Sequence, residues 1–243
     1  MTAKSSAAGQ SGPTTGAIGP DTYARWRATR LGAVTEALEH RLVSDLVGHV
    51  SGKRLLDLGC GDGLLTCRLA TPGAWAVGID ADDRMLAAAR ARASRGGVNA
   101  RFVQSRIEQL PLPDASFDVV VAVTVFCFLT DRAAAMTEAV RVLRPGGRFV
   151  LAELGRWSAW AAIRRIRAWL GAPTWRAAHF WTAAELCQMV EHAGVSVDAV
   201  SGSVYYPPVE WAAALLAPFD RRLGPLTTGA AFIAVAGTKT SLE

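Results

Sequence analysis

Apolar and polar positions along the chain change their spacing several times, and each spacing predicts a different kind of element. Between residues 23 and 50, Val34, Leu38, Leu42 and Leu46 recur at the spacing of one helix face. Beyond residue 52, short apolar runs alternate with helical segments. The expected strands span residues 54–58, 74–79, 100–104, 117–125 and 148–153, and the expected helices between them span 64–70, 83–94 and 132–143.

Strands that alternate with helices at this spacing predict βαβ units, and therefore a parallel sheet with helices on both faces. The run 117–125 shows no polar alternation, which is typical of a strand buried on both sides. After residue 154 the alternation ends. The pattern there predicts one capped helix, 182–193, and two further strands, 195–201 and 230–238.

Composition indicates a globular protein with a substantial core. The chain has 243 residues, 51 % of them hydrophobic and 19 % charged, which suits one α/β domain. Its net charge of +5 is a mild excess and does not indicate the concentrated basic face of a nucleic-acid-binding protein, so no nucleic-acid partner is expected. Residues 1–20 are expected to form a disordered tail, because they cannot bury enough apolar surface.

Cysteine usage and hydropathy predict the compartment. Cys60, Cys67, Cys127 and Cys187 show no metal-ligand spacing, and no histidine pair accompanies them, so no metal site is predicted. Isolated thiols of this kind are typical of a reducing compartment. The tail lacks an apolar signal-peptide core, and no stretch approaches the roughly 18 apolar residues of a membrane-spanning helix. The expected location is cytoplasmic, and the oligomeric state stays open.

A glycine-rich turn carries the strongest chemical information. Residues 55–63 read LLDLGCGDG, at the point where the first expected strand meets a helix. The glycines let the backbone turn sharply and let a ligand approach the main chain. Open α/β sheets bind ligands at this end of their strands. The second strand ends at Asp80, whose carboxylate can accept both hydroxyls of a ribose. The two features together predict an adenosine site.

The spacing of the glycines decides between adenosine-containing ligands. A dinucleotide site expects G-x-G-x-x-G, but here the third glycine is Gly63 and Leu64 occupies the expected place. The resulting G-x-G-x-G turn is poor for a pyrophosphate. It suits a cofactor without phosphate, whose methionine part lies along the loop. The Walker sequence of nucleoside-triphosphate-binding loops is absent.

Two further segments show a family resemblance. Residues 110–118 read LPLPDASFD, before the fourth strand, and residues 141–147 read RVLRPGG, before the fifth. With the glycine turn, these segments resemble the class I methyltransferases that use S-adenosylmethionine (SAM), specifically the small UbiE-like group. The resemblance implies a doubly wound, seven-stranded, mostly parallel α/β sheet of the Rossmann-like methyltransferase fold, with an antiparallel last strand and helical lid elements. It also implies one methyltransferase domain, 21–243, made of a cap helix (21–50), a SAM-binding half (51–153) and a substrate lid with closing strands (154–243).

The resemblance also assigns cofactor contacts. The residues it places against SAM, or against its product S-adenosylhomocysteine (SAH), are Tyr23, Trp26, Gly59, Cys60, Gly61, Asp80, Ala81, Met85, Ile107 and Val123. Among these, the two glycines would contact the methionine part, Asp80 the ribose, Ile107 the adenine, and Val123 the sulfonium side. Tyr23, Trp26 and also Arg30 fit the place where an N-terminal helix closes over the cofactor.

One position departs from the family pattern. An acid often precedes the adenine-flanking residue, and here that place is Arg106, which cannot accept a hydrogen bond. Either Glu108 or a backbone carbonyl takes over, or the adenine is held more loosely.

Catalysis needs little from the protein, because the cofactor already carries an activated leaving group. The protein must mostly align the acceptor and exclude water. The catalytic residue is therefore unknown, with Glu153, at the end of the fifth strand, and His179 as candidates.

Aromatic residues after the fifth strand bear on the acceptor. Six tryptophans gather there, at positions 157, 160, 169, 175, 181 and 211, and they favour a small, aromatic or apolar acceptor, or a cation held by the rings. Residues 156–170 read as a basic amphipathic helix, with Ile163, Ile166 and Leu170 on one face and Arg164 and Arg165 on another. Such a helix packs on the core or makes transient membrane contact.

The leading hypothesis is SAM-dependent methyl transfer to a small-molecule acceptor. A membrane-associated lipid or quinone methyltransferase is an alternative that differs in its partner. An RNA or DNA methyltransferase is another, although residues 122–126 lack the NPPY-like sequence of base-modifying enzymes. A SAM-binding protein that does not methylate would show the same binding residues.

Overall fold

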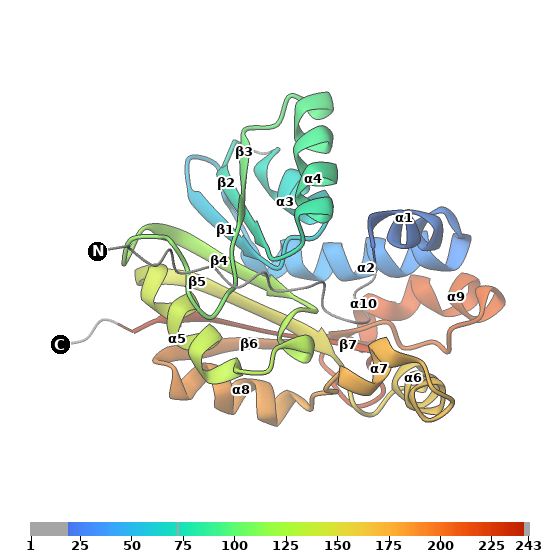
Figure 1. Ribbon diagram of the computed structural model, residues 1–243. Helices are drawn as coiled ribbons and strands as arrows, with labels where there is room; N and C mark the ends of the chain where they lie inside the picture. The colour runs from blue at the N-terminus through green and yellow to red at the C-terminus, as the bar shows by residue number, and fades with distance from the viewer. Residues whose placement is uncertain (1–18, 72, 241–243) are drawn as a thin grey trace, which may run out of the picture.

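The computed structural model describes residues 19–71 and 73–240, and a seven-stranded sheet forms its centre (Figure 1). The expected tail, 1–20, lies outside the described residues except for Gly19 and Pro20. The strands are β1 (Arg54–Leu58), β2 (Trp75–Asp80), β3 (Ala100–Gln104), β4 (Phe117–Val123), β5 (Leu143–Leu154), β6 (Val195–Ser203) and β7 (Phe232–Lys239). Their order across the sheet is β3-β2-β1-β4-β5-β7-β6.

The strand directions confirm the predicted fold class. β1 runs parallel to both β2 and β4, β3 to β2, and β5 to β4. β7, the last strand in the chain, is antiparallel to its neighbours β5 and β6. The switch in strand order between β1 and β4 leaves a crevice at their carboxyl ends, where sheets of this kind bind ligands.

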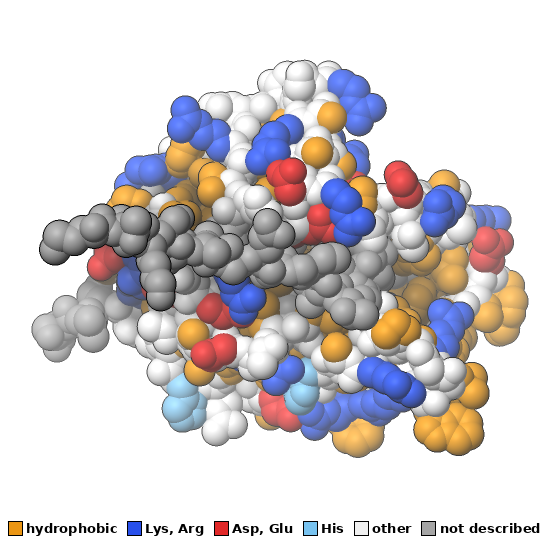
Figure 2. All heavy atoms as spheres, viewed as in Figure 1, with side chains coloured by type: hydrophobic (Ala, Val, Ile, Leu, Met, Phe, Trp, Pro, Cys, Tyr) orange, Lys and Arg blue, Asp and Glu red, His pale blue; other side chains and the backbone are white. Residues whose placement is uncertain are grey.

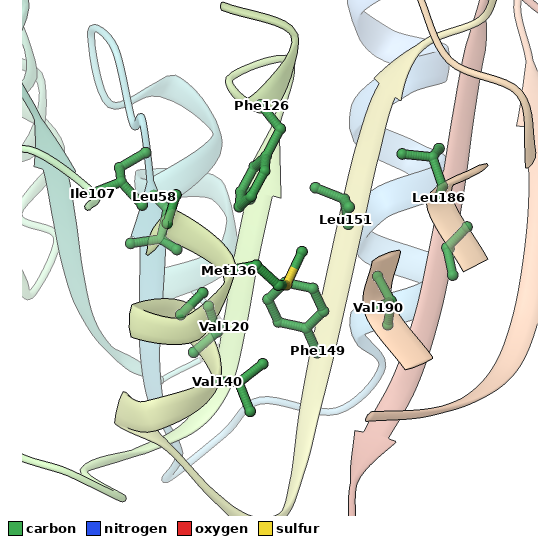
Figure 3. Packing of buried hydrophobic residues seen from close by; sticks show 14 of the residues in the cluster. Leu58, Ile107, Val120, Phe126, Met136, Val140, Phe149, Leu151, Leu186 and Val190 are labelled. Atoms are coloured by element: carbon green, nitrogen blue, oxygen red, sulfur yellow. The ribbon is translucent and has the colours of Figure 1, made fainter. Parts of the chain in front are cut away.

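Helices cover both faces of the sheet. One face packs against α2 (Arg30–Val47), α3 (Leu64–Ala70) and α9 (Glu210–Leu216), and the other against α5 (Arg132–Val142) and α8 (Ala183–His192). β4 shows the alternation directly. Val119 and Val121 join the first layer and Val120 joins the second, and all three are fully buried. The burial of each such side chain stabilises the folded state by about 1.5–3 kcal/mol. Figure 3 shows the second layer, with Met136 beside Phe149 of β5.

The predicted N-terminal helix is two helices. α1 (Pro20–Ala28) ends before Thr29, whose backbone is extended and whose hydroxyl accepts a hydrogen bond from the Gly32 backbone N–H at 3.0 Å. Thr29 is therefore the N-cap of α2. A Cβ atom on Gly32 would lie 2.0 Å from the Trp26 carbonyl oxygen, so the two helices meet too closely for a larger residue.

β4 is shorter than the predicted strand 117–125. The chain leaves the sheet at Thr124, which has a φ of +49°, and then forms a short 3₁₀ helix, η1 (Phe126–Phe128). The cause lies in β5. The Glu153 carboxylate accepts hydrogen bonds from the backbone N–H groups of Val125, Phe126 and Cys127 and so replaces the ladder partners that a longer strand would have had.

The basic helix also differs from its prediction. α6 (Ala159–Trp169) buries Trp160 and Ala161, whereas Ile166 and Leu170 are exposed. Arg164, expected on the polar face, lies on the inner side with Trp160. The orientation follows from packing, because the large indole of Trp160 is buried together with its N–H, which donates to the Tyr206 carbonyl oxygen at 2.9 Å.

Three further elements complete the lid side: α7 (Pro173–Ala177), η2 (Ala217–Phe219) and α10 (Asp220–Leu223). α4 (Asp83–Gly96) follows β2. Across residues 19–71 and 73–240, no helix combines the length and the apolar composition needed to cross a bilayer. The same residues contain no group of three or more His, Cys, Asp or Glu side chains placed to hold a metal ion.

Candidate active site

A cavity of about 480 Å³ lies where the carboxyl ends of β1, β2 and β4 meet the N-terminal helices and α6. We call it the active-site cavity. Its wall includes all ten residues expected to contact the cofactor, namely Tyr23, Trp26, Gly59, Cys60, Gly61, Asp80, Ala81, Met85, Ile107 and Val123. The structure therefore brings the predicted set together, while Arg30 is not part of the wall.

The glycine turn is held tightly against the sheet. The backbone N–H groups of Gly59 and Cys60 both donate to the Ile79 carbonyl oxygen, at 2.7 and 2.9 Å. Gly59 has a φ of +71°, and a Cβ atom there would lie 2.5 Å from the Val125 side chain. Gly61 also has a positive φ, but a Cβ atom there would meet nothing. The turn thus exposes backbone to the cavity at Gly61, where a ligand can approach.

Asp80 joins this turn to the end of β2. One carboxylate oxygen accepts from the Gly61 backbone N–H and the other from the Asp82 backbone N–H, both at 2.9 Å. Each carboxylate oxygen has two lone pairs, so one on each remains for a ligand hydroxyl. Burial raises the pKa of Asp80 above its ordinary value. A fixed carboxylate beside exposed loop backbone fits the ribose and methionine parts of an adenosine ligand.

Asp57 has a different role from Asp80. Its side chain is buried and accepts a hydrogen bond from the Thr66 hydroxyl at 2.6 Å, which ties β1 to α3. Burial raises the pKa of Asp57 to about 7. This contact agrees with a carboxylate that organises the loop.

At the end of the cavity where adenine is expected, Glu108 supplies a carboxylate next to Arg106, the residue that departs from the family pattern. Ile107 is buried, and Arg106 points its mostly exposed guanidinium at Glu108, with 2.8 Å between nitrogen and oxygen. The Glu108 side chain is largely covered and lies on the cavity wall. Of the alternatives open for the adenine amino group, the structure thus offers Glu108 as an acceptor, held in place by Arg106.

An ion-pair network fixes α1 over the cavity. The Asp62 carboxylate of the glycine turn contacts Arg27 of α1 at 2.5 Å and Arg92 of α4 at 2.6 Å. Arg27 lies in the helix that carries Tyr23 and Trp26, so the ion pair with Asp62 connects α1 directly to the glycine turn. The sequence pattern did not identify this network, because its three members are far apart in the chain.

Neither catalytic candidate lies on the cavity wall. Both oxygens of Glu153 are used by three backbone N–H groups, and the side chain is fully buried. The ring of His179 lies 4.4 Å from that of Trp181, and burial with the nearby Arg132 and Arg156 lowers its pKa. We therefore interpret Glu153 as the residue that shapes the loop after β4, and we do not assign proton transfer to His179.

The rest of the cavity has residues that the sequence did not single out as a group. We call this part the acceptor half, and it is lined by Glu39 of α2, Phe128, Leu129, Arg164 of α6 and Trp175 of α7. Burial raises the pKa of Glu39 to about 7, while the charge of Arg164 lowers it. A titratable carboxyl and a guanidinium thus lie among aromatic and apolar side chains.

Only part of the tryptophan prediction agrees with the structure. Of the six tryptophans after β5, Trp175 lines the cavity, whereas Trp160 and Trp181 are buried in the core. Trp157, Trp169 and Trp211 are 63 %, 82 % and 71 % exposed. Of the six tryptophans expected to bear on the acceptor, Trp175 is therefore the one whose indole lines the cavity.

Comparisons with known proteins agree with this geometry. A methyltransferase-domain family matches residues 56–151. The ubiquinone biosynthesis O-methyltransferase of Methylobacterium sp. (strain 4-46) is 32 % identical over 198 residues, covering 78 % of this chain and 80 % of the relative. The demethylmenaquinone methyltransferase of Thermus thermophilus is 41 % identical over 115 residues, covering 46 % and 52 %. The crystal structure of a SAM-dependent methyltransferase from Thermotoga maritima shares the fold, with a TM-score of 0.72, 24 % identity and coverage of 90 % and 96 %.

The sheet order, the turn at Gly59 and Gly61, the acid at the end of β2 and these similarities define a SAM-dependent methyltransferase. The chain belongs to the class I family, in its UbiE-like group, and SAM is its methyl donor.

Proposed function

We propose that this enzyme methylates a hydroxyl oxygen of a small aromatic acceptor of the kind found in quinone precursors. The observation that carries the proposal is the joined cavity, in which the cofactor residues and the acceptor half form one continuous wall. Phe128, Leu129 and Trp175 supply apolar and aromatic surface for a flat ring. The names of the relatives, which refer to O-methylation and to quinones, support an acceptor of this class.

The protein contributes alignment and exclusion of water. SAM, when bound, supplies a methyl group on a positively charged sulfur. The residues of the glycine turn and Asp80 would fix the cofactor, and α1 with Tyr23 and Trp26 would cover it. The aromatic residues would orient the acceptor ring so that its oxygen faces the methyl carbon in line with the departing sulfur.

Two measurements test this function. In a thermal-shift assay, SAM and SAH should raise the melting temperature and NAD should not. With SAM present, catechol and 3,4-dihydroxybenzoate should yield mono-O-methyl products and SAH by mass spectrometry, and anisole, which has no free hydroxyl, should yield neither. Stabilisation by SAM without a methylated product from any hydroxylated ring would contradict the proposed acceptor.

A surface feature supports a second proposal, that the enzyme takes its acceptor from a membrane. Ile166, Trp169 and Leu170 are exposed at the end of α6, and Trp211 and Leu215 are exposed on α9. Figure 1 places α6 and α9 at the same end of the molecule, and Figure 2 shows basic side chains among large hydrophobic ones there. Exposed tryptophans with arginines are typical of surfaces that bind an anionic lipid headgroup region.

Vesicle flotation tests this surface. The SAH-saturated protein should float with vesicles containing phosphatidylglycerol, and less with pure phosphatidylcholine vesicles. Replacing Trp169 and Leu170 by serine should abolish flotation, because it removes apolar area from the exposed end of α6. Arg95→Ser, an exposed position on α4, is the control. Flotation of the double variant at the wild-type level would contradict the proposal.

A further inference from the structure

The acceptor half brings together two charged side chains from distant parts of the chain. Glu39 lies on α2 and Arg164 on α6, 125 positions later, and both line the active-site cavity beside Tyr23 of α1. The same cavity wall also contains the aromatic side chains of Trp175 and Phe128. Neither is among the residues that the cofactor-binding pattern explains.

Arg164 is held by aromatic faces. Its guanidinium lies 5.1 Å from the ring centre of Trp160 and 4.7 Å from that of Trp175. It forms no ion pair with a carboxylate in residues 19–71 and 73–240, whereas Arg27, Arg92 and Arg156 each do. Arg164 is half-buried, and this burial lowers its pKa. The charge is therefore fixed in position by stacking and acts on Glu39 through space.

The groups around Glu39 shift its pKa in both directions. Its pKa is raised to about 7, first by burial and then by the negative charges of Glu36 on α2 and Asp220 on α10, while Arg164 on α6 lowers it. The pKa of Tyr23 on α1 is also raised, first by burial and then by the negative charge of Glu39. A base is most effective when it titrates near the working pH, because it is then partly ionised and still able to hold a proton.

We infer that Glu39 is the general base for the acceptor hydroxyl, and that Arg164 is a positioning residue that keeps Glu39 ionised in the closed cavity. The inference rests on the proposed O-methylation and adds to it the class of acceptor: a phenolic or enolic hydroxyl that must lose its proton, rather than an amine that is already nucleophilic. It also assigns a role to the inward turn of Arg164 on α6.

The step balances as follows. The acceptor O–H bond breaks, and its proton moves to a Glu39 carboxylate oxygen. A lone pair on the acceptor oxygen forms the new bond to the methyl carbon, and the carbon–sulfur bond breaks with its electron pair left on sulfur, giving neutral SAH. The proton on Glu39 then passes to water when the product leaves, and the next cycle begins with the carboxylate ionised.

A chromophoric acceptor tests this assignment. We choose 4-nitrocatechol, whose visible absorbance changes when a phenolic proton leaves. Bound to the SAH-saturated wild-type protein, it should show the ionised spectrum at a lower pH than it does free in solution. Glu39→Gln should still bind the probe and SAH but lose that spectral shift, and with SAM its kcat should fall about a hundredfold.

The dependence of kcat on pH distinguishes the role of Glu39 from that of Arg164. Wild-type kcat should fall on the acidic side with an apparent pKa near that of Glu39, about 7. Arg164→Met keeps the packing against the two indoles but removes the charge that lowers the pKa of Glu39. The acidic limb of the kcat profile should therefore move to higher pH. Glu39→Asp should restore part of the activity. Asp45→Asn, which removes an exposed carboxylate of the same helix, should leave both the limb and kcat unchanged.

The outcomes are distinguishable. Methylation of the probe by Glu39→Gln with an unchanged acidic limb would overturn the assignment of Glu39. An unmoved limb in Arg164→Met would overturn the assignment of Arg164. Failure of wild-type protein to bind or methylate any hydroxylated ring, with SAM binding intact, would instead overturn the proposed function. A retained SAM thermal shift shows that each variant is folded.

Discussion

Two carboxylates near the carboxyl ends of β2 and β5 show how acidic side chains in similar places take different roles. Asp80 ends β2 and keeps a lone pair on each oxygen toward the active-site cavity. Glu153 lies one residue before the end of β5 and gives both oxygens to backbone N–H groups. In the sequence both follow apolar strands, so the pattern cannot separate them. Which N–H groups reach each carboxylate is decided by the loops that follow β1 and β4.

Asp80→Asn is expected to weaken SAM binding while leaving the fold intact. The amide keeps one acceptor oxygen but replaces the other by a donor, which faces either the Asp82 N–H or the Gly61 N–H. Loss of a charge-assisted hydrogen bond costs about 1.5–3 kcal/mol, which is about a tenfold to hundredfold rise in Kd. Isothermal titration with SAH measures this. Asp83→Asn, at an exposed position nearby, is the control, and equal affinities for both variants would contradict the role of Asp80.

Glu153→Ala is expected to destabilise the protein rather than to remove a catalytic group. The change leaves three backbone N–H groups without their acceptor, and the N–H groups of Phe126 and Cys127 are buried. Each unsatisfied buried donor costs about 1–3 kcal/mol, so the free energy of unfolding should fall by about 3 kcal/mol or more. Urea denaturation measures the fall. A variant with wild-type stability and no activity would restore Glu153 as a catalytic candidate.

At the scale of elements, α1 is a helix without buried residues that an ion pair connects to the glycine turn. None of its residues is buried, and Arg27 connects it to Asp62 of the glycine turn. Helical periodicity predicted a helix in this region correctly, but it did not predict the interruption at Thr29. That interruption depends on a side-chain cap and on the close contact at Gly32, and periodicity describes neither.

Arg27→Met is expected to loosen α1 and weaken cofactor binding. Methionine keeps much of the apolar stem but removes the contact with Asp62, so Tyr23 and Trp26 lose their fixed position over the cavity. We expect the Kd for SAM to rise about tenfold, the effect of losing about 1.4 kcal/mol. Arg25→Met, which changes an exposed arginine of the same helix whose guanidinium donates to the Thr22 hydroxyl, is the control. Unchanged affinity in Arg27→Met would show that α1 is not part of the cofactor site.

α6 shows where pattern reasoning fails for an element. Apolar spacing predicted Ile166 and Leu170 on one face and Arg164 on another, without deciding which face packs on the core; in the structure Trp160 is the residue that the core accommodates. Once the indole is buried, residues four positions away on the same face must turn inward, which brings Arg164 to the cavity. The stacking of a cation on two indoles compensates for its partial burial.

At the scale of the whole molecule, the sequence predicted the order of strands and helices through β5, and the ten residues it grouped around the cofactor line one cavity. Those features are local: a glycine turn, a strand and the acid at its end recur within one βαβ unit. The acceptor half depends on α2, η1, α6 and α7 meeting in space. No short segment contains that arrangement, which is why Glu39 and Arg164 emerged only from the fold.

Buried ionisable groups make the stability of the ligand-free protein depend on pH. Burial raises the pKa of Glu39, Asp57 and Glu153 to about 7, so between about pH 5 and pH 7 the folded protein holds protons that the unfolded chain has released. Burial lowers the pKa of His40 to about 4 and that of His179, which acts in the opposite direction. The three carboxyls outweigh the two imidazoles, so stability falls as pH rises through this window.

Thermal unfolding at a series of pH values measures this effect. The melting temperature should decline from about pH 5 to about pH 7 and then level off. Glu39→Gln should show a shallower decline, since its amide does not titrate. A melting temperature that rises steadily across the window would contradict the balance of buried groups.

The break at Thr29 has a consequence for the order of events in turnover. α1 carries two residues of the cavity wall and is joined to α2 through Thr29, so we expect exchange of spent SAH for fresh SAM to involve a movement of that short helix about Thr29. The acceptor half is lined mainly by residues of α2, η1, α6 and α7, which lie outside α1. Turnover should therefore follow a compulsory sequence in which the donor binds first and its by-product departs last. SAH would then inhibit competitively against SAM and noncompetitively against the acceptor, and its residence time would set the pace of the enzyme.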